Sequence, residues 1–409
     1  MNEVKSFGEL SIAKLLKENL ERAQFFSTTP IQGRALIPAL EGRDILGTAK
    51  TGSGKTLAFL LPIIDRLMKT SGREIEALVL VPTRELAAQI MDTLKIIGEH
   101  SGIPVALVVG GLAEFRQLNA IKRGARIVIA TPGRLNDYLK RKEVSLKSVK
   151  ILVLDEADRM VDMGFLPQMR AIMNHVPAQR QSMCFSATLD KTVAHLVHDY
   201  LKNPLRLEVD STSKPAESII LRMFEVAKEQ KLYLLIYMLQ TEPGTFLVFT
   251  RTKHGADKLF RKLKYNGFDA AVLHGGKSQS QRTRALGGFK EGKHRVLIAT
   301  DIAARGIHID KIGHVINYDL PQNSDDFIHR VGRTGRVEES GVAVTFVTPE
   351  DFYDIRTIER LLGKKIERLV LPAGLASEPK FAPGAYGRQE SRARPPFSGR
   401  RNFRPRKSF

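Results

Sequence analysis

The chain has 409 residues, and its 64 lysines and arginines against 44 aspartates and glutamates give a formal net charge of +20. The length predicts two domains and a tail, while 43% hydrophobic and 26% charged residues are typical of a soluble globular protein. No apolar run of about 18 residues predicts a membrane helix, the start MNEVKSFGEL lacks the apolar segment of a signal peptide, and one cysteine excludes an internal disulfide. We therefore expect a cytoplasmic protein without a membrane partner, and the excess positive charge favours nucleic acid as its partner over a merely cationic surface.

Short apolar runs alternate with amphipathic stretches in the first half of the chain. One helix is predicted over TRELAAQIMDTLKIIGEH (83–100). The apolar runs that predict strands are GRDILG (42–47), ALVLV (77–81), VALVV (105–109), RIVIA (126–130), KILVL (150–154) and SMCFSA (182–187). Unbroken apolar strands separated by helices are typical of a parallel sheet that is covered on both faces.

A polar stretch, EVDSTSKPAES (208–218), interrupts this pattern and predicts a linker. A second alternating block follows it, with TFLVF (245–249), AAVLH (270–274), RVLIAT (295–300), HVINY (314–318) and VAVTFV (342–347). The sequence thus predicts two α/β domains, residues 1–207 and 219–372. The remainder, 373–409, is rich in Arg, Gly, Pro and Ser and poor in aliphatic residues, so we expect a disordered basic tail.

The stretch AKTGSGKT lies between a strand-like and a helix-like run, and it matches the phosphate-loop pattern G-x-x-x-x-G-K-[ST] except for Ala49 at the first position. Gly52 and Gly54 would allow backbone N–H groups to surround phosphate oxygens at a helix N-terminus. We expect Lys55 to contact the β- and γ-phosphates and Thr56 to bind Mg²⁺. The alternative is a chance glycine turn.

A second element, the acidic stretch LVLDEAD (152–158), makes a chance match of the glycine loop improbable. A buried strand there delivers carboxylates at its C-terminal end, where open α/β sheets bind ligands. We expect Asp155 to hold Mg²⁺ and Glu156 to orient the attacking water. Taken alone, these residues could equally form an acidic helix cap.

The second half contains HRVGRTGR (329–336) but neither a phosphate loop nor an acidic strand end. Arginine suits the charge that develops on a transferred phosphoryl group, because its planar fork binds phosphate oxygens. We infer that Arg333 and Arg336 close onto a nucleotide held by the first half. Without the phosphate site in the first half, HRVGRTGR would be interpreted as a solvated basic turn. Closure of the two halves would then shape a nucleic-acid groove.

With these residues in place, the chain resembles the DEAD-box RNA helicases over about residues 7–350. The motifs that carry this resemblance occur in the family's order: FFSTTPIQ (25–32), AKTGSGKT (49–56), PTRELAAQ (82–89), TPGR (131–134), DEAD (155–158), SAT (186–188), VFTRT (248–252), HGGKSQSQR (274–282), ATDIAARGI (299–307) and HRVGRTGR (329–336). The resemblance implies two tandem RecA-like domains, ATP as the nucleotide and an RNA-stimulated ATPase. The compact core and short basic tail are similar to the RhlE-type branch.

The resemblance also implies which residues contact ATP. Gln32 would read the adenine edge and Phe7 would pack against the base, while Gln24 and Thr28 replace the family's usual Gly and Pro. The implied nucleotide-binding residues are Phe7, Phe25, Gln32, Thr51, Gly52, Ser53, Gly54, Lys55, Thr56 and Gly306.

For RNA, the resemblance implies backbone contacts with little base specificity. The implied RNA-binding residues are Pro82, Thr83, Arg84, Gly111, Thr131, Arg134, Arg251, Arg282, Thr300 and Asp301. Ser186 and Thr188 would link the acidic site to the RNA side. His308 stands where the family usually has an Asp that contacts ribose. Cys184, inside an apolar run, is expected to be a small buried hydrophobe rather than a nucleophile.

Three functions fit this pattern. The first is an ATP-dependent RNA helicase that separates short duplexes locally, and the second is an RNA-gated ATP clamp that serves as an assembly platform. The third is a DNA translocase, which the DEAD and FFSTTPIQ stretches disfavour. We expect a monomer that works with ribosome-assembly or RNA-decay proteins, and a tail that tethers RNA through Arg charge and aromatic stacking, unless it is an inert solubilising end.

Overall fold

The computed structural model describes residues 3–49, 52–189, 191–209, 219–304, 312–322, 324–335, 341–373 and 375, with backbone alone at 302 and 325. Both sheets lie within residues 1–371. Among the residues described, no helix is long and apolar enough to span a bilayer. Thr51, Gly306, His308, Arg336 and nearly all of the predicted tail lie outside the described residues.

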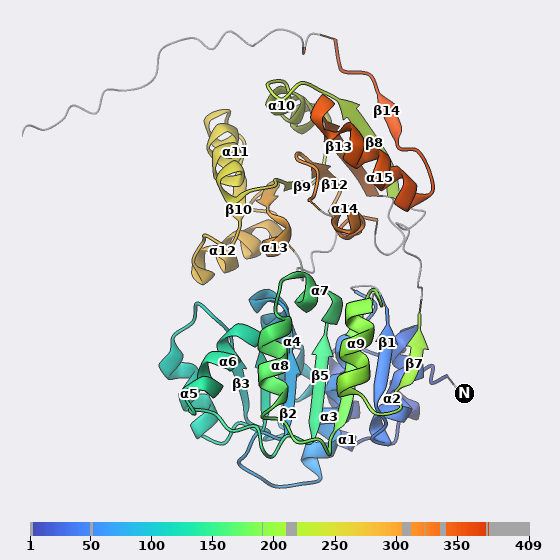
Figure 1. The fold of residues 1–409 in the computed structure, drawn as a ribbon, viewed down its shortest axis with the longest axis vertical. Helices are drawn as coiled ribbons and strands as arrows, with labels where there is room; N and C mark the ends of the chain where they lie inside the picture. Colours follow the sequence, from blue (N-terminus) through green and yellow to red (C-terminus); the bar gives the residue numbers. More distant parts are fainter. Residues whose placement is uncertain are drawn as a thin grey trace, which may run out of the picture. The chain divides into compact units, whose positions relative to one another are not determined.

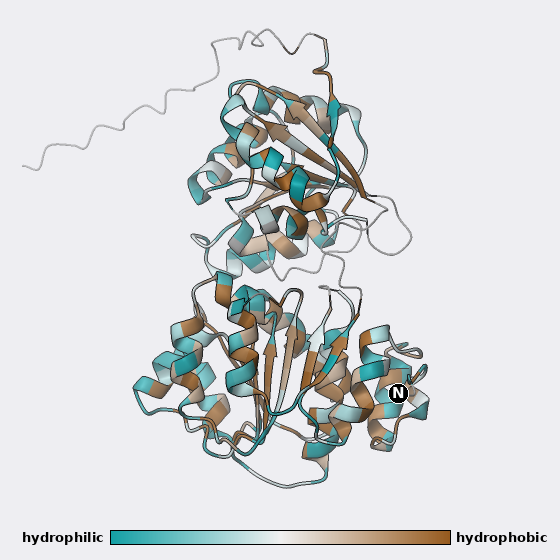
Figure 2. Ribbon diagram, turned by 45° about the vertical axis from the view of Figure 1, so that its right-hand side comes forward, coloured by the Kyte–Doolittle hydropathy of each residue, from teal (hydrophilic) through white to brown (hydrophobic). Residues whose placement is uncertain are grey.

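The first sheet has seven parallel strands in the order β3-β4-β2-β5-β6-β1-β7 (Figure 1). Its strands are β1 Ile45–Thr48, β2 Ala77–Leu80, β3 Val105–Val108, β4 Ile127–Ala130, β5 Ile151–Asp155, β6 Gln181–Ser186 and β7 Leu205–Glu208. Most of these strand residues are buried, and Figure 2 shows the hydrophobic strands between more polar helices. Burial on both faces explains why the runs are continuously apolar rather than alternating.

Helices cover both faces of this sheet. Alternate strand side chains such as Val79 and Val153 pack with leucines of α2, α3 and α4, whereas their neighbours Leu78 and Leu152 pack with α6, α8 and α9. The helical elements of this part are η1 Phe7–Glu9, α1 Lys14–Arg22, α2 Pro30–Leu40, α3 Lys55–Met68, α4 Arg84–Ile97, α5 Glu114–Lys122, α6 Pro132–Lys140, α7 Ala157–Asp162, α8 Leu166–Met173 and α9 Lys191–Tyr200.

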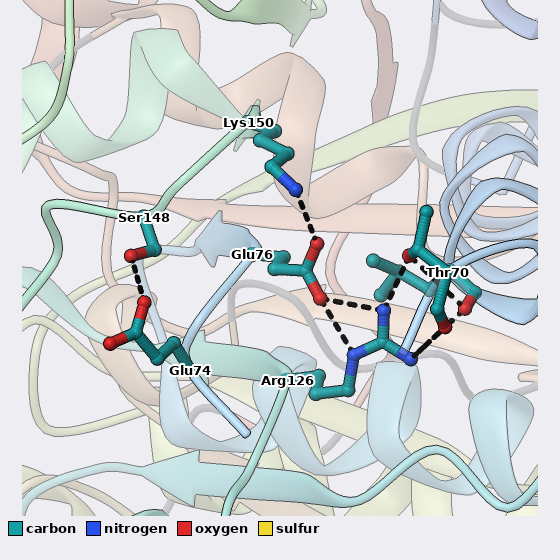
Figure 3. Close-up of polar contacts among 7 residues, drawn as sticks. Thr70, Glu74, Glu76, Arg126, Ser148 and Lys150 are labelled. Carbon is teal, nitrogen blue, oxygen red and sulfur yellow. Dashed lines mark hydrogen bonds and ion pairs between the residues drawn. The ribbon is translucent and has the colours of Figure 1, made fainter. Parts of the chain in front are cut away.

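A charge cluster of the buried Glu76 and Arg126 with the exposed Lys150 connects the N-terminal ends of three neighbouring strands (Figure 3). Glu76 precedes β2 and pairs with Arg126 before β4 at 2.6 Å and with Lys150 before β5 at 2.8 Å. Arg126 also donates to the carbonyl oxygens of Leu67 and Thr70, each at 2.9 Å. Burial raises the pKa of Glu76, but Lys150 and Arg126 outweigh burial and lower it. The cluster braces the sheet edge opposite the strands' C-terminal ends.

The second sheet repeats the topology of the first. Its order, β10-β11-β9-β12-β13-β8-β14, is the first order with each number raised by seven, and all pairs are again parallel. The strands are β8 Ile219–Glu225, β9 Phe246–Phe249, β10 Ala270–Leu273, β11 Val296–Ala299, β12 His314–Asn317, β13 Gly341–Val347 and β14 Glu367–Leu369. Every strand of the first sheet therefore has a counterpart in the second.

Helices of the second part bury leucines, isoleucines and phenylalanines against this sheet. One face carries Leu247 and Leu297 with α12, α14 and α15, while Val248 and Ile298 point to the opposite face and are also buried. The helical elements are α10 Lys231–Thr241, α11 Lys253–Tyr265, α12 Gln279–Lys290, α13 Asp301–Ala304, α14 Ser324–Val331, η2 Pro349–Asp351 and α15 Phe352–Leu362. We call residues 3–209 the first lobe and 219–371 the second lobe.

The predicted α/β class with parallel sheets flanked by helices is confirmed, and every predicted strand is present within a few residues. The predicted strands omitted β7, β8 and β14, of which β7 and β14 lie at a sheet edge and expose part of their residues. Glu208, the first residue of the expected linker, is the last residue of β7. The other linker residues from 210 to 218 are not described.

Candidate active site

The strand order sorts the candidate residues of the first lobe into two groups along one sheet edge. The glycine loop follows β1, the acidic pair ends β5 and the SAT stretch follows β6, and these three strands are neighbours. The other half of the edge, after β2, β3 and β4, holds Pro82, Thr83, Arg84, Gly111, Thr131 and Arg134. Parallel strands bring all of these C-terminal ends to the same side, which is where open α/β sheets bind ligands.

The glycine loop has the backbone conformation that its sequence predicts. Gly52 and Gly54 both have a backbone φ of +89°, which residues with a Cβ rarely adopt. A Cβ at Gly54 would also overlap the side-chain amide of Gln32. Lys55 is the first residue of the 14-residue helix α3 and is only 6% exposed. Its ammonium donates to the carbonyl oxygen of Ala49 at 2.9 Å, so the ammonium sits across the loop at the positive end of the helix.

Gln32 connects the FFSTTPIQ stretch to this loop. Its Nε2 donates to the carbonyl oxygen of Gly54 at 2.8 Å, and its Oε1 accepts from the backbone N–H of Thr29 at 2.8 Å. Phe25 is 37% exposed, whereas Phe7 is 3% exposed and belongs to the hydrophobic core. The side-chain hydroxyl oxygen of Ser53 is buried without a hydrogen-bond partner, and Thr56 is half-buried in the first turn of α3.

Asp155 and Glu156 are both buried, yet their environments push their pKa values in opposite directions. Burial raises the pKa of Asp155 to about 6, against the opposing effect of Lys55. Burial also raises the pKa of Glu156, but Arg159, Lys55 and Arg333 outweigh burial and lower it to about 2. The Glu156 carboxylate pairs with Arg159 at 2.5 Å.

The backbone of Glu156 is strained. Its φ of 53° and ψ of 53° place a residue with a long side chain in the left-handed region. Such strain in a non-glycine residue costs of order 1–3 kcal/mol and clusters at functional sites. The turn lets the two adjacent carboxylates leave the end of β5 in different directions, toward different partners.

Asp158 connects the acidic turn to the SAT stretch, a role the sequence reasoning missed. Its Oδ2 accepts from the backbone N–H groups of Ala187 and Thr188, each at 2.9 Å, and from the hydroxyl of Thr188 at 3.1 Å. In return, the Ser186 hydroxyl accepts from the backbone N–H of Asp158 at 3.2 Å. Asp158 is the last residue of the DEAD stretch, but the sequence alone does not show that it contacts SAT. The contact follows only from β5 and β6 being neighbouring strands.

One cavity is lined by residues of both lobes. Lys55, Glu156, Asp158, Arg159, Asp162 and Ala187 come from the first lobe, and His329 and Arg333 from the second. Arg333 is 6% exposed, and its Nε donates to the carbonyl oxygen of His329 at 3.2 Å. The structure thus brings the predicted arginine of the second lobe into the cavity that holds the predicted lysine and glutamate of the first.

The other half of the first sheet's edge carries cations on rigid supports. Arg84 lies so close to Gly111 that a Cβ there would overlap its guanidinium, so this glycine, at φ +77°, makes room for the arginine. The Arg134 guanidinium pairs with Glu114 and lies 5.5 Å from the ring centre of Tyr138. Thr83 caps α4, its hydroxyl accepting from the backbone N–H of Leu86 at 3.3 Å.

The second lobe places its candidates after the counterpart strands. Arg251 follows β9, Arg282 lies in α12 after β10, and Thr300 and Asp301 follow β11. These strands correspond to β2, β3 and β4, so the two lobes divide their edges in the same way.

Internal ion pairs hold two of these second-lobe candidates. Arg282 pairs with Glu85 of the first lobe at 2.8 Å, and Gln279 also donates to Glu85 at 3.2 Å. The carboxylate of Asp301 accepts from Arg330 at 2.5 Å and 2.8 Å. Arg330, which is 2% exposed, was missed because the sequence does not show which arginine of HRVGRTGR is buried. Cys184 is fully buried in β6 and burial raises the pKa of its thiol, which confirms it as a buried hydrophobe.

Comparison with known proteins identifies the family. Residues 29–196 match the model of the DEAD/DEAH box helicase family, and residues 227–338 match that of the helicase conserved C-terminal domain. The chain is 38% identical to the DEAD-box ATP-dependent RNA helicase CshA of Geobacillus kaustophilus, over 90% of this chain and 79% of the relative. It is 37% identical to the DEAD-box ATP-dependent RNA helicase RhpA of Helicobacter pylori, over 90% of this chain and 74% of that one.

Two solved structures share the fold. Dbp5 of S. cerevisiae bound to RNA and ADP BeF3 matches with a TM-score of 0.78 and 32% identity, covering 89% of this chain and 95% of that one. The DEAD-box helicase Mss116 bound to ssRNA and UDP-BeF matches with a TM-score of 0.81 and 27% identity, covering 90% and 80%. The chain therefore belongs to the DEAD-box helicases, ATP-hydrolysing enzymes built from two RecA-like domains.

Proposed function

We propose that the protein is an ATP-dependent RNA helicase that binds RNA across both lobes and couples ATP hydrolysis to local, non-processive unwinding of short duplexes. The observation that carries this proposal is the cavity shared by Lys55 and Glu156 of one lobe and Arg333 of the other. A hydrolysis site that is complete only when two lobes meet can link the nucleotide state to lobe closure. The RNA in the Dbp5 and Mss116 structures supports RNA as the polymer.

In this proposal the first lobe binds the triphosphate. The backbone N–H groups of the glycine loop and the ammonium of Lys55 bind its β- and γ-phosphates. Glu156, ionised at neutral pH because its pKa is about 2, orients the attacking water. Arg333 places a guanidinium against the charge that develops on the γ-phosphate, and Arg336 is proposed to act with it. Gln32, whose Nε2 donates to the carbonyl oxygen of Gly54, and the exposed Phe25 are proposed to contact the base.

The residues present fit Mg²⁺. The Thr56 hydroxyl and the Asp155 carboxylate are the oxygen ligands that this hard cation prefers. Asp155 is buried and its raised pKa shows that its negative charge is poorly compensated, so a cation beside it would favour the ionised form. When bound, Mg²⁺ would neutralise charge on the β- and γ-phosphates.

RNA would bind along the strand ends that do not hold the nucleotide. Arg84, Arg134 and Arg251 are cations on this half of the two edges, and the hydroxyls and loop N–H groups beside them bind phosphate and sugar. Contacts of this kind carry little sequence information. Asp158 joins the acidic stretch to the SAT stretch by hydrogen bonds. It would transmit closure of the two lobes between the hydrolysis site and the RNA side.

ATPase activity measured with RNA, with DNA of the same sequence and without polymer tests the proposal. We expect RNA to stimulate hydrolysis well above DNA, and the wild type to release the strand of a short RNA duplex. Lys55→Ala and Glu156→Gln should abolish both activities. Strand release that survives either substitution would contradict the assigned chemistry, and ATP-dependent retention of RNA without strand release would favour a clamp instead. We retain three predictions from the sequence: a monomer, ribosome-assembly or RNA-decay proteins as partners, and membership of the RhlE-type branch.

A further inference from the structure

The second lobe retains the framework of a phosphate site without its loop. β8 is the counterpart of β1, and α10 follows β8 as α3 follows β1. The connection in the second lobe, VAKEQ (226–230), contains no glycine and cannot form the phosphate-binding turn of the first lobe. Even so, a lysine, Lys231, is the first residue of α10, as Lys55 is of α3.

Protein groups surround the ammonium of Lys231. The ammonium of Lys231, whose side chain is 6% exposed, donates to the carbonyl oxygen of Tyr318 at 2.8 Å and lies 3.5 Å from Oδ1 of Asp319. These two residues directly follow β12, the counterpart of the strand that carries Asp155. A lysine at the start of the helix and an aspartate just beyond β12 are thus present here, and they pair with each other.

The same aspartate reaches an arginine that the proposed function assigns to RNA. Oδ2 of Asp319 accepts from the backbone N–H of Arg251 at 3.0 Å. The guanidinium of Arg251 lies 3.5 Å, at Nη2, from Oδ1 of Asp351. Asp351 is itself fixed, because its Oδ2 accepts from the backbone N–H of Thr348 at 2.9 Å and from the Thr348 hydroxyl at 2.6 Å. One carboxylate therefore holds the backbone of Arg251 and another holds its side chain.

We propose that Asp319 and Asp351 are positioning residues that fix Arg251 for a phosphate of the RNA backbone; this inference rests on the proposed function. The Arg251 side chain is 44% exposed while that of Asp351 is 10% exposed, so a buried anion anchors a cation that solvent reaches. The ion pair engages Nη2, at one end of a fork with five N–H donors, and leaves the rest of the fork to face a phosphate. An arginine that is already ordered loses less rotamer freedom when it binds.

Asp351→Asn tests the proposal more cleanly than a change at Asp319. An asparagine keeps one oxygen for the Thr348 N–H and replaces the charged oxygen facing Arg251 with an amide. Removing the charge of Asp319 would instead leave Lys231 buried without its carboxylate partner, which threatens folding. Asp354→Asn, at an exposed position three residues further on in the first turn of α15, is the matched control.

RNA affinity with a nonhydrolysable ATP analogue, measured by fluorescence anisotropy, is the main readout. We expect Asp351→Asn to weaken RNA binding about two- to fivefold, the range of a partly exposed ion pair, and Asp354→Asn to leave it unchanged. The RNA concentration for half-maximal ATPase should rise by the same factor while kcat at saturating RNA and the unfolding temperature stay at the wild-type values. A merely structural loss would change kcat and the unfolding temperature as well.

A double-mutant cycle decides whether the effect passes through the arginine. On the background of Arg251→Ala, the Asp351→Asn substitution should weaken RNA binding no further. The same loss on both backgrounds would overturn the proposal, as would wild-type affinity in either single variant. A wild-type protein that does not bind RNA would instead overturn the proposed function. Failure of the positioning proposal and failure of the proposed function are therefore distinguishable.

Discussion

The two neighbouring carboxylates of the acidic turn should have opposite effects on the stability of the protein without nucleotide and Mg²⁺. Asp155 and Glu156 are adjacent in sequence and both more than nine-tenths buried, so replacing either with its amide is a near-isosteric change. We expect Asp155→Asn to raise the free energy of unfolding and Glu156→Gln to lower it. Both variants should lose ATPase activity, so function alone would not separate them.

The size of the stability change for Asp155 follows from its pKa of about 6, against 3.8 for an ordinary aspartate. That difference of about two pH units, at about 1.4 kcal/mol per unit, means that the ionised side chain disfavours the folded state by up to ~3 kcal/mol. A group with a raised pKa stabilises the folded state most below its unfolded pKa, and this contribution is lost as pH rises through the folded pKa. The advantage of Asp155→Asn should therefore grow between about pH 4 and 6 and stay constant above.

Glu156 behaves in the reverse sense. Its pKa of about 2, against 4.5 for an ordinary glutamate, means that the ionised carboxylate, through Arg159, Lys55 and Arg333, stabilises the folded state. By the same conversion the contribution is up to ~3 kcal/mol, fully present above pH 4.5 and lost as pH falls toward 2. Glu156→Gln removes it and also leaves the buried Arg159 without its anion, so the variant should be less stable throughout the neutral range.

Urea unfolding at pH 5, 6, 7 and 8 with a chelator present measures both effects. The exposed Asp137→Asn is the control for removing one negative charge from the surface, and it should match the wild type at every pH. An Asp155→Asn variant that is less stable than the wild type at pH 8, or whose advantage does not shrink between pH 6 and 5, would refute an unfavourable charge at Asp155. Equal changes in the two amide variants would show that the two carboxylates share one environment.

Three further predictions concern the supports of the site. Arg126→Met should lower the free energy of unfolding by about 3–5 kcal/mol, because Glu76 loses a buried partner, while ATPase activity per folded molecule stays at the wild-type level in a steady-state assay. Gly54→Ala should weaken binding of a fluorescent ATP analogue, because φ of +89° costs a side chain about 1–2 kcal/mol, and unchanged affinity would contradict the loop geometry. Ser186→Ala removes the acceptor for the backbone N–H of Asp158, so strand release should fall more than ATP hydrolysis in parallel assays, and an equal fall in both would argue against coupling at this contact.

Much of the fold could be predicted because apolar periodicity is a local property. Runs such as ALVLV and KILVL are buried on both faces, so they stay apolar throughout and predict central parallel strands. The edge strands β7 and β14 were missed because they expose part of their residues, and their polar side chains look like those of a loop. The strand order could not be predicted, since it depends on contacts between distant segments.

The site followed a similar division. The glycine loop and the DEAD stretch were predictable because their chemistry requires fixed residue types at fixed spacing. The roles of Asp158 and Arg330 were not, because their partners Thr188 and Asp301 follow β6 and β11, and only folding makes them neighbours. The pairing of Lys231 with Asp319 was likewise invisible until the repeated strand order aligned the two lobes.

The central claim is that the second lobe completes a hydrolysis site in the first, and single-turnover ATP hydrolysis by Arg333→Ala with saturating RNA tests it most directly. The exposed Arg360→Ala serves as the control for loss of a positive charge. We predict that Arg333→Ala binds ATP with nearly wild-type affinity but hydrolyses it about 10³-fold more slowly, the lower end for an arginine finger. A hydrolysis rate within about twofold of the wild type, a difference far below that of an arginine finger, would contradict the account.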